Sequence, residues 1–472
     1  MIISAAKWQT GATFITFALS LLQLTVLARV FDAKAFGYLA IVMVSVNIYQ
    51  TLSDLGMANY LVFVQKVSDA LNSTVFWICA FAGLVLCLCM QLTSGLIENY
   101  YDMQGLGQLL NIAALALIPV SLGAQLQARY MLEFKLSALA KFDIIAKLIS
   151  TSFVVITVTT LGFELDAVVL GVVLSASVKL LLLCSFSEKG WLPKFKFSKY
   201  DAQQAWGYGK FQVGSQVLNK LREELDIIIL GMFIDAAKLG LYSLAKQLAQ
   251  KIASLIVPIV RKLTLPLIAK SRSNQKTLTS VVYKSHCIST VMLVFPHILL
   301  LFVAQQVTVL FYGEQKLGVA VYLIPLTIFY MLRSVGGALA GSICQGLGKT
   351  NIDFYWNVSV FFIYAIIAFI SAQFSELYTA YSYAIIQLLL LNAVYVLFYK
   401  NTVGLAFSRY ITPIITSLLI SLLICVGFMF TLNTAQLAIS NSLTASAIYV
   451  LLCTGAYAVY CVKKIRIWSR HD

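Results

Sequence analysis

The sequence predicts an all-α integral membrane protein, and three observations carry that prediction. Hydrophobic residues make up 60% of the 472 positions and charged residues only 11%, against about 25% charged residues in soluble domains. The apolar residues gather into about fourteen stretches, each long enough to cross a bilayer core of roughly 30 Å. Each helix with its connection then occupies about 34 residues, which leaves room only for short loops. Any function must therefore lie within the helix bundle, as in a transporter.

The predicted spans follow one another with short polar breaks. A charged turn comes directly after the first span, so we interpret that span as an uncleaved helix and not as a signal peptide. The expected helices occupy residues 8–31, 38–60, 73–92, 107–127, 142–162, 165–186, 206–233, 239–268, 277–303, 319–346, 350–371, 375–398, 410–431 and 440–462.

The distribution of basic residues predicts the orientation of the chain. Lys and Arg concentrate in the connections that follow the even-numbered spans, such as those holding Lys66, Lys135 and Lys194, whereas the opposite connections hold mainly acids. By the positive-inside rule, both termini are then cytoplasmic. The net charge of +15 is thereby explained as a topology signal, so no nucleic-acid partner is expected. Contact with anionic headgroups of the phospholipid bilayer is an additional role for these residues.

A short internal repeat divides the chain. The turn that starts at residue 31 reads Phe-Asp-Ala-Lys-Ala-Phe-Gly, and the turn that starts at residue 234 reads Ile-Asp-Ala-Ala-Lys-Leu-Gly. The shared Asp, Ala and Gly lie about 200 residues apart, which is the length of six helices with their connections. The repeat therefore predicts two pseudo-symmetric six-helix lobes related by an axis along the membrane normal, plus two C-terminal helices.

The predicted domains follow from this repeat. An N-lobe occupies residues 1–186 and a C-lobe residues 206–398. Between them, residues 187–205 form a cytoplasmic inter-lobe connection, and residues 399–472 contain the last two spans and a cytoplasmic tail. Such an arrangement places a cavity between the lobes at mid-membrane.

Several stretches resemble a known family. They include Ala-Arg-Val-Phe at residues 28–31, Ser-Asp-Leu-Gly-Met at 53–57 and Gly-Leu-Gly-Lys at 346–349. In these stretches the chain resembles the polysaccharide transporter family, the Wzx-type flippases of the multidrug/oligosaccharidyl-lipid/polysaccharide (MOP) superfamily. It is most similar to the branch that handles colanic acid and teichuronic acid, over about residues 1–400.

The resemblance implies a function. Such a protein moves undecaprenyl-pyrophosphate-linked oligosaccharide repeat units of an O-antigen, capsule or exopolysaccharide from the cytoplasmic to the periplasmic leaflet. It does so in the bacterial inner membrane by alternating access, as a monomer and not as an enzyme. A polysaccharide polymerase and chain-length machinery are the protein partners that the resemblance implies.

Ionisable residues inside the predicted spans are candidates for substrate contact, because each one is costly in a bilayer. Spans seven and eight together carry more cations than carboxylates, and span ten adds an arginine without a carboxylate in the same span. This excess matches the negative charge of a pyrophosphate. Arginine is preferred over lysine because its planar fork fits phosphate oxygens. The substrate-binding candidates are Arg222 and Arg333, followed by Lys220, Lys246 and Lys251.

A second group of charged residues is expected to act in gating or coupling. Arg29 lies near the outer end of the first span and is interpreted as an interface anchor or gate. Asp54 is expected to cap a helix, to form an ion pair, or to take up a proton. The remaining members, on span seven, are Glu223, Glu224 and Asp226.

Internal pairing is the alternative interpretation of these charges. Lys220 and Glu224 are i,i+4 neighbours, as are Arg222 and Asp226. Folding spans seven and eight antiparallel also brings Asp226 level with Lys246, and Glu223 level with Lys251.

The other cations need no functional explanation at this stage. We interpret Lys147, Lys179 and Lys284 as residues near inner span ends whose side chains extend to the interface.

The sequence gives no sign of a metal or cofactor. The nine cysteines lie in or beside apolar spans without zinc-like spacing, so they are expected to be thiols packed as small hydrophobes. No nucleotide-binding motif is present, which argues against ATP hydrolysis by this chain.

Other functions stay open. Within the superfamily, the alternatives are a peptidoglycan-precursor flippase and a cation-coupled drug exporter, although exporters typically have twelve helices. A membrane polysaccharide polymerase is disfavoured, because the longest outer breaks, at residues 93–106 and 304–318, hold no His or Arg cluster. The identity of the sugar and the coupling ion do not follow from the sequence.

Overall fold

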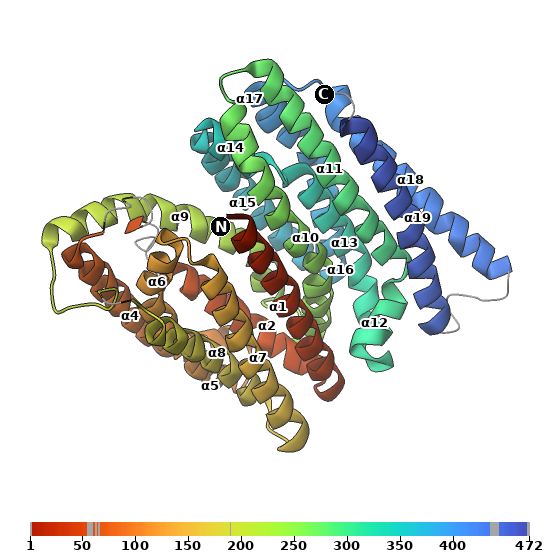
Figure 1. The fold of residues 1–472 in the computed structure, drawn as a ribbon. Helices are drawn as coiled ribbons and strands as arrows, with labels where there is room; N and C mark the ends of the chain where they lie inside the picture. Colours follow the sequence, from red (N-terminus) through yellow and green to blue (C-terminus); the bar gives the residue numbers. More distant parts are fainter. Residues whose placement is uncertain are drawn as a thin grey trace. The chain divides into compact units, whose positions relative to one another are not determined.

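A computed structural model describes the chain apart from residues 1, 54–59, 62–63, 65–66, 189, 435–442 and 470–472. All regular structure in the described residues is helical (Figure 1). Thirteen segments are long and apolar enough to cross a membrane. A further helix, α9 (Lys199–Leu230), has 32 residues but is not among the thirteen, because it is crowded with charges between residues 220 and 226. With α9 included, the described residues contain all fourteen predicted segments.

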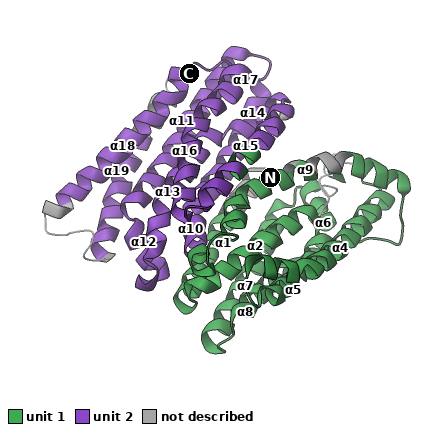
Figure 2. Cartoon of the chain, turned by 180° about the vertical axis from the view of Figure 1, so that it is seen from behind, with its two compact units in different colours: residues 1–240, 360–365 green, residues 241–359, 366–472 purple. Residues whose placement is uncertain are grey.

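The chain divides into two compact units (Figure 2). Unit 1 comprises Met1–Gly240 together with Val360–Ala365. Within it, α1 lies along α7, α4 packs against α5 and α6, and α9 packs against α2 and α4. Besides α9, its helices are α1 (Ile2–Val30), α2 (Ala33–Ser53), α4 (Asp69–Tyr101), α5 (Leu106–Ala114), α6 (Leu117–Leu132), α7 (Leu136–Thr160) and α8 (Leu165–Ser185).

Unit 2 comprises Leu241–Ser359 and Ile366–Asp472. Within it, α11 packs against α13 and α18, and α13 against α16. Its elements are most of α10 (Ala236–Ser271), α11 (Gln275–Phe302), α12 (Ala304–Tyr312), the short helix η1 (Glu314–Lys316), α13 (Gly318–Gly337), α14 (Ala340–Leu347), most of α15 (Thr350–Ala372), α16 (Glu376–Val394), the π-helix η2 (Tyr395–Lys400), α17 (Asn401–Val403), α18 (Phe407–Thr434) and α19 (Leu443–Ser469).

The compact units and the predicted lobes divide the chain at different places. The sequence pattern assigns residues from 206 onward to the second lobe, whereas α9 packs with the helices of unit 1. The compact units are defined by which helices contact each other, whereas the lobes are defined by the repeat in the sequence. The units therefore do not test the lobe boundaries, which stay a prediction.

Side-chain caps mark the starts of several spans. The hydroxyl of Ser68 accepts a hydrogen bond from the backbone N–H of Leu71 at the start of α4, over 3.1 Å. Ser375 does the same for Tyr378 at the start of α16, over 3.2 Å. These hydroxyls satisfy amide groups that the first turn of a helix leaves without an intrahelical acceptor.

Two spans that the sequence predicts as continuous are interrupted. The span predicted at 107–127 breaks between α5 and α6, four residues before Pro119. A proline removes the hydrogen bond to the fourth residue before it and is tolerated in a first turn, so α6 begins at this point. The span predicted at 319–346 breaks between α13 and α14, just after Gly336 and Gly337, and adjacent glycines weaken a helix.

A predicted loop also contains a helix. Residues 304–318 were expected to form an outer connection, but α12 and η1 occupy most of them.

The two turns of the repeat fold alike. The carboxylate of Asp32 accepts a hydrogen bond from the backbone N–H of Ala35 over 2.9 Å, and that of Asp235 accepts one from Lys238 over 2.9 Å. Each aspartate thereby caps the helix that follows it, α2 or α10. The shared aspartate of the repeat therefore has the same local role in both turns.

The two turns also meet each other. A Cβ atom on Gly37 would lie 2.0 Å from the carbonyl oxygen of Ala236, and one on Gly240 would lie 1.8 Å from the carbonyl oxygen of Ala33. Both positions therefore require glycine. A contact that is the same in both directions is expected where two copies of a motif are related by a twofold axis.

The core of unit 2 contains a cluster of aromatic side chains. His286 is fully buried, its Nε2 lies 2.9 Å from the carbonyl oxygen of Tyr410, and its ring stacks on that of Tyr410 with centroids 4.9 Å apart. The Tyr399 hydroxyl donates to the carbonyl oxygen of Gly336 over 3.3 Å. These contacts join α11, η2, α13 and α18. Nε2 of the buried His286 and the hydroxyl of the buried Tyr399 are thus paired with backbone carbonyl oxygens.

Candidate substrate site

The charged part of α9 forms an ion cluster. Lys220 Nζ lies 3.1 Å from Glu224 Oε1 and 3.7 Å from Glu223 Oε2. Glu224 Oε1 also accepts a hydrogen bond from the side-chain amide of Asn47 in α2, over 3.3 Å. The side chain of Glu224 is only 13% exposed, so this pairing is largely shielded. The predicted pairing of Lys220 with Glu224 is confirmed.

The end of α9 beyond this cluster is fixed against α4. Asp226 is buried, and its carboxylate accepts a hydrogen bond from the backbone N–H of Ile227 over 2.9 Å. Two residues after Asp226, the carbonyl oxygen of Ile228 accepts from the hydroxyl of Tyr101, over 3.1 Å. Arg222 is half-buried on the same helix. Its predicted pairing with Asp226 stays a prediction.

A second polar contact in unit 1 was not foreseen. Lys147 lies near the middle of α7, and its ammonium donates to the side-chain oxygen of Gln23 in α1 over 2.7 Å. The hydroxyl of Thr151 donates to the same oxygen over 3.2 Å. The ammonium of Lys147 is thus directed to a neighbouring helix, and the interpretation of Lys147 as a residue that extends to the interface stays a prediction. Gln23, a polar residue within an apolar span, was the signal in the sequence.

The other predicted binding residues belong to unit 2. Lys246 is buried in α10, Lys251 follows it partly buried on the same helix, and Arg333 is partly buried in α13. The predicted proximity of Lys246 to Asp226, and of Lys251 to Glu223, would join the two units. It stays a prediction.

The two remaining gating candidates have different outcomes. Arg29 is exposed in the last turn of α1, and its role as an interface anchor or gate stays a prediction. Asp54 lies outside the described residues.

Unit 1 also contains a cavity of about 530 Å³ at the end where α1 meets α2. Its charged lining consists of Asp32, Glu164 and Asp166, with Lys34 as the cation. None of the predicted binding residues lines it. Because its carboxylates would repel a pyrophosphate, we do not assign the substrate to this cavity.

The described residues offer no metal centre. They contain no group of three or more His, Cys, Asp or Glu side chains that is arranged to hold an ion. All nine cysteines lie in the described part of the chain, and none of them forms a disulfide there.

Comparison with known proteins decides the family. Residues 26–321 match the family described as "Polysaccharide biosynthesis protein". The chain belongs to this family. The resemblance of the sequence to polysaccharide transporters is thereby confirmed.

Curated relatives carry names from the same field. The chain is 28% identical to the amylovoran biosynthesis protein AmsL of Erwinia amylovora, over 75% of this chain and 91% of the relative. It is 27% identical to the lipopolysaccharide biosynthesis protein WzxC of Escherichia coli K12, over 87% of this chain and 83% of the relative. It is also 27% identical to the teichuronic acid biosynthesis protein TuaB of Bacillus subtilis 168, over 97% and 96% of the two chains.

Solved structures share the fold. The lipid II flippase MurJ, in an inward closed conformation, superposes with a TM-score of 0.78 at 14% identity and covers 97% of this chain and 98% of its own. An inward-facing MATE-family multidrug transporter superposes with a TM-score of 0.60 at 13% identity and covers 98% of its own chain but 83% of this one. These matches confirm an all-helical transporter fold of the predicted kind.

Proposed function

We propose that this family member is a flippase that translocates undecaprenyl-pyrophosphate-linked oligosaccharide repeat units of a surface polysaccharide. The observation that carries the proposal is the family match over residues 26–321, on a chain whose fold is that of membrane transporters. The relatives named for amylovoran, lipopolysaccharide and teichuronic acid synthesis support a polysaccharide precursor as cargo. A transporter fold supports carriage of the finished repeat unit, and not its synthesis.

The substrate contacts belong to the cations inside the helices. Arg222 and Arg333 remain the first candidates for the pyrophosphate, because a guanidinium can donate two parallel hydrogen bonds to phosphate oxygens. Lys246 and Lys251 are further candidates on α10. Lys220 is the remaining candidate, and its ammonium contacts two carboxylates. In the described structure Lys220 therefore fits the internal-pairing interpretation better.

Lys147 joins this set. Its ammonium and the Thr151 hydroxyl both donate to the side-chain oxygen of Gln23. These three residues, between α1 and α7, therefore bring a cation, a hydroxyl and an amide together. Such groups suit the phosphates and hydroxyls of a glycosyl pyrophosphate.

Transport would proceed by alternating access between the lobes at residues 1–186 and 206–398. The inward-open state would bind the substrate through these cations, and release in the outward-open state would follow from a lower affinity there. Both termini would lie in the cytoplasm, in the bacterial inner membrane. The protein would act as a monomer, and a polysaccharide polymerase with its chain-length machinery would use the translocated repeat unit.

Depletion of the protein in its own host tests this function. The expected result is a loss of surface polysaccharide with accumulation of the undecaprenyl-pyrophosphate-linked repeat unit on the cytoplasmic side, while cell shape and growth are kept. Lysis with accumulated peptidoglycan precursor would indicate the alternative precursor flippase. Increased sensitivity to cationic drugs with unchanged polysaccharide would indicate an exporter. Either of these results would overturn the proposal.

A further inference from the structure

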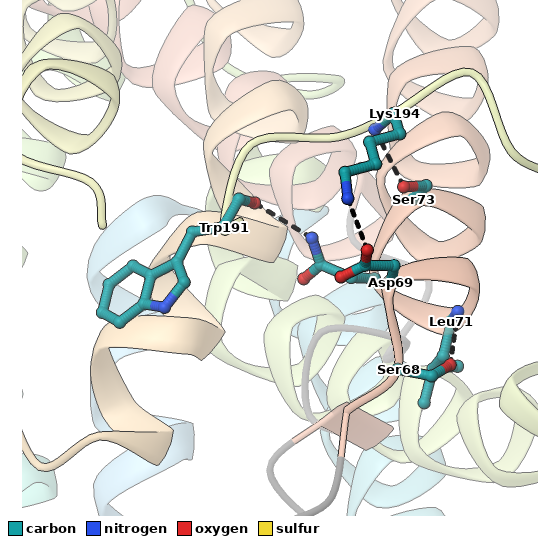
Figure 3. Close-up of polar contacts among 7 residues, drawn as sticks. Ser68, Asp69, Leu71, Ser73, Trp191 and Lys194 are labelled. Carbon is teal, nitrogen blue, oxygen red and sulfur yellow. Dashed lines mark hydrogen bonds and ion pairs between the residues drawn. The ribbon is translucent and has the colours of Figure 1, made fainter. Parts of the chain in front are cut away.

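The connection between α8 and α9 is held firmly on the first turns of α4. The side-chain amide of Asn72 donates to the carbonyl oxygen of Trp191 over 2.9 Å, and the Ser73 hydroxyl accepts the backbone N–H of Lys194 over 2.9 Å. The ammonium of Lys194 also forms an ion pair with the carboxylate of Asp69 (Figure 3). Residues 191–198, which we call the strap, are therefore fixed to the start of a membrane-spanning helix.

Two further contacts continue the attachment along α4. The backbone N–H of Ser198 donates to the Thr74 hydroxyl over 2.9 Å, and the indole N–H of Trp77 donates to the carbonyl oxygen of Lys194 over 3.1 Å. The ring of Phe195 then stacks on the ring of Trp77, with centroids 5.3 Å apart. The strap thus lies along more than two turns of α4.

The length of α4 places the strap relative to a bilayer. With 33 residues, α4 is about 50 Å long, which exceeds a hydrocarbon core of roughly 30 Å and extends through the headgroup layers. Trp77 lies about 12 Å along the axis from the first residue of α4. That depth corresponds to the boundary between headgroups and acyl chains, where tryptophan is enriched.

The solvent-exposed face of the strap combines aromatic rings with lysines. Phe195 is 96% exposed and Phe197 is 63% exposed, which is unusual for rings on a segment held in place by hydrogen bonds. Lys196 lies between these two rings and Lys199 follows them, and both lysines are exposed. An aromatic and basic surface of this kind fits the interface of a membrane that contains anionic lipids.

The position of Lys199 supports a role outside its own helix. It is the first residue of α9, where the helix dipole disfavours a cation. The carboxylate of Asp201 in the same first turn offsets the positive potential of the helix end. The attraction for an anion in front of the strap therefore comes from the exposed lysines Lys196 and Lys199.

We propose that the strap is a membrane-surface anchor, in which Phe195 and Phe197 insert at the headgroup level while Lys196 and the adjoining Lys199 bind anionic phospholipid headgroups. The contacts with α4 hold the backbone of the strap and the ring of Phe195 in place, so the anchor fixes the starts of α4 and α9 to the membrane surface. This role is separate from the transported substrate and does not depend on its identity.

A fluorescence experiment on the full-length protein tests the anchor. The Phe195→Trp variant is placed in nanodiscs that contain phosphatidylcholine or phosphatidylglycerol brominated near the headgroup end of the acyl chains, and the signal of the parent protein is subtracted. We expect quenching by the bromines, stronger by about twofold or more with the anionic lipid. In the background of Lys196→Gln with Lys199→Gln, the two lipids should quench equally, because the rings remain but the charges are gone.

The matched control is Phe163→Trp. Phe163 is 53% exposed in the turn between α7 and α8, next to the acidic Glu164, so quenching there should not favour the anionic lipid. Emission at position 195 that resists both bromolipids but is quenched by aqueous iodide would show that the strap faces water or another protein, and would overturn the proposal. Equal quenching by the two lipids with the lysines intact would contradict the binding of anionic headgroups by Lys196 and Lys199.

A second measurement guards against misfolding of the variants. Phosphatidylglycerol that stays bound during purification in mild detergent is counted for the parent and for Lys196→Gln with Lys199→Gln. We expect fewer retained anionic lipids in the variant at unchanged thermal stability, and an unchanged lipid count would contradict the anchor. Neither readout involves transport, so both are independent of the proposed flippase function.

Discussion

Gly37 and Gly240 occupy equivalent places in two turns of one repeat, and each packs against the backbone of the other turn. A Cβ atom on Gly37 would come within 2.0 Å of the Ala236 carbonyl oxygen, and one on Gly240 within 1.8 Å of the Ala33 carbonyl oxygen. The repeat therefore preserves a close backbone approach as well as a cap. No other residue type fits without moving one of the turns.

Gly37→Ala and Gly240→Ala should each destabilise the protein by about 1–3 kcal/mol, the usual cost of overpacking, or prevent its folding. The loss of stability is measured by heating the protein in detergent and by recording, with size-exclusion chromatography, how much folded protein remains. Gly95→Ala is the matched control: Gly95 lies within α4, and a Cβ there meets nothing within 4 Å. It should be neutral or stabilising by about 0.5–1 kcal/mol. Equal behaviour of all three variants would contradict the close approach.

The ion cluster of α9 should tolerate a charge exchange only in part. Lys220→Glu alone brings three carboxylates together and should cost roughly 1–3 kcal/mol, between the values for an exposed and a buried pair. Adding Glu224→Lys restores one attraction but removes the oxygen that accepts from Asn47, so part of the stability should return. The yield of folded protein reports both steps. If the double variant were no better than the single one, the contact between Lys220 and Glu224 would not matter for folding.

Lys147 separates structural from transport roles. In Lys147→Met, a cation is removed from the membrane together with its hydrogen bond to Gln23. Interhelical hydrogen bonds in membranes are worth about 0.6 kcal/mol on average, so thermal stability should change little. Surface polysaccharide should fall strongly if the ammonium contacts the substrate. Normal export combined with a large loss of stability would instead make Lys147 a tie between α1 and α7.

Arg333→Ala should abolish surface polysaccharide while the amount of folded protein stays the same. The loss of charged hydrogen bonds of about 1.5–3 kcal/mol corresponds to roughly 10–100-fold in substrate affinity. Arg333→Lys should recover part of the export, because the charge survives although the fork is lost. Arg272→Ala, at an exposed site just after α10, is the control. Normal export by Arg333→Ala would remove Arg333 from the site, and reduced folding would favour internal pairing.

The strap should open when its first contact is removed. Asn72 is buried and donates to the Trp191 carbonyl oxygen, so Asn72→Ala should cost about 1–3 kcal/mol by leaving that oxygen with fewer donors. Trypsin should then cut faster after Lys196 and Lys199 in inside-out vesicles. Ser137→Ala, in the first turn of α7 and so on a different helix from Asn72, serves as control. An unchanged cleavage rate would mean that Asn72 does not hold the strap.

The thirteen apolar segments could be predicted because the length of apolar runs is a local property of the sequence. The pairing of Lys220 with Glu224 could be predicted for the same reason, since i,i+4 neighbours share one helix face. An irregularity in the span at 107–127 could also be predicted, because a proline inside a span is expected to kink its helix. The break between α5 and α6 lies just before Pro119.

Contacts between distant helices could not be predicted. Gln23 and Lys147 are 124 positions apart, and no periodicity within α1 or α7 indicates that these two positions face each other. Asn72 and Trp191 are separated by 119 positions, and the sequence marked their region only as a basic linker. The repeat located Gly37 and Gly240, but their backbone approach follows from how the turns pack.

Translocation by the purified protein tests the central claim most directly. Liposomes receive the protein together with an undecaprenyl-pyrophosphate-linked oligosaccharide labelled on its sugar with a fluorophore, and a membrane-impermeant reductant is added outside. Without translocation, the reductant reaches only the labelled lipid in the outer leaflet, which is about half of the total. The account predicts that nearly all of the fluorophore is reduced with the parent protein, and about half of it with Arg333→Ala. Reduction that stops near half with the folded parent protein would contradict a lipid-linked oligosaccharide flippase.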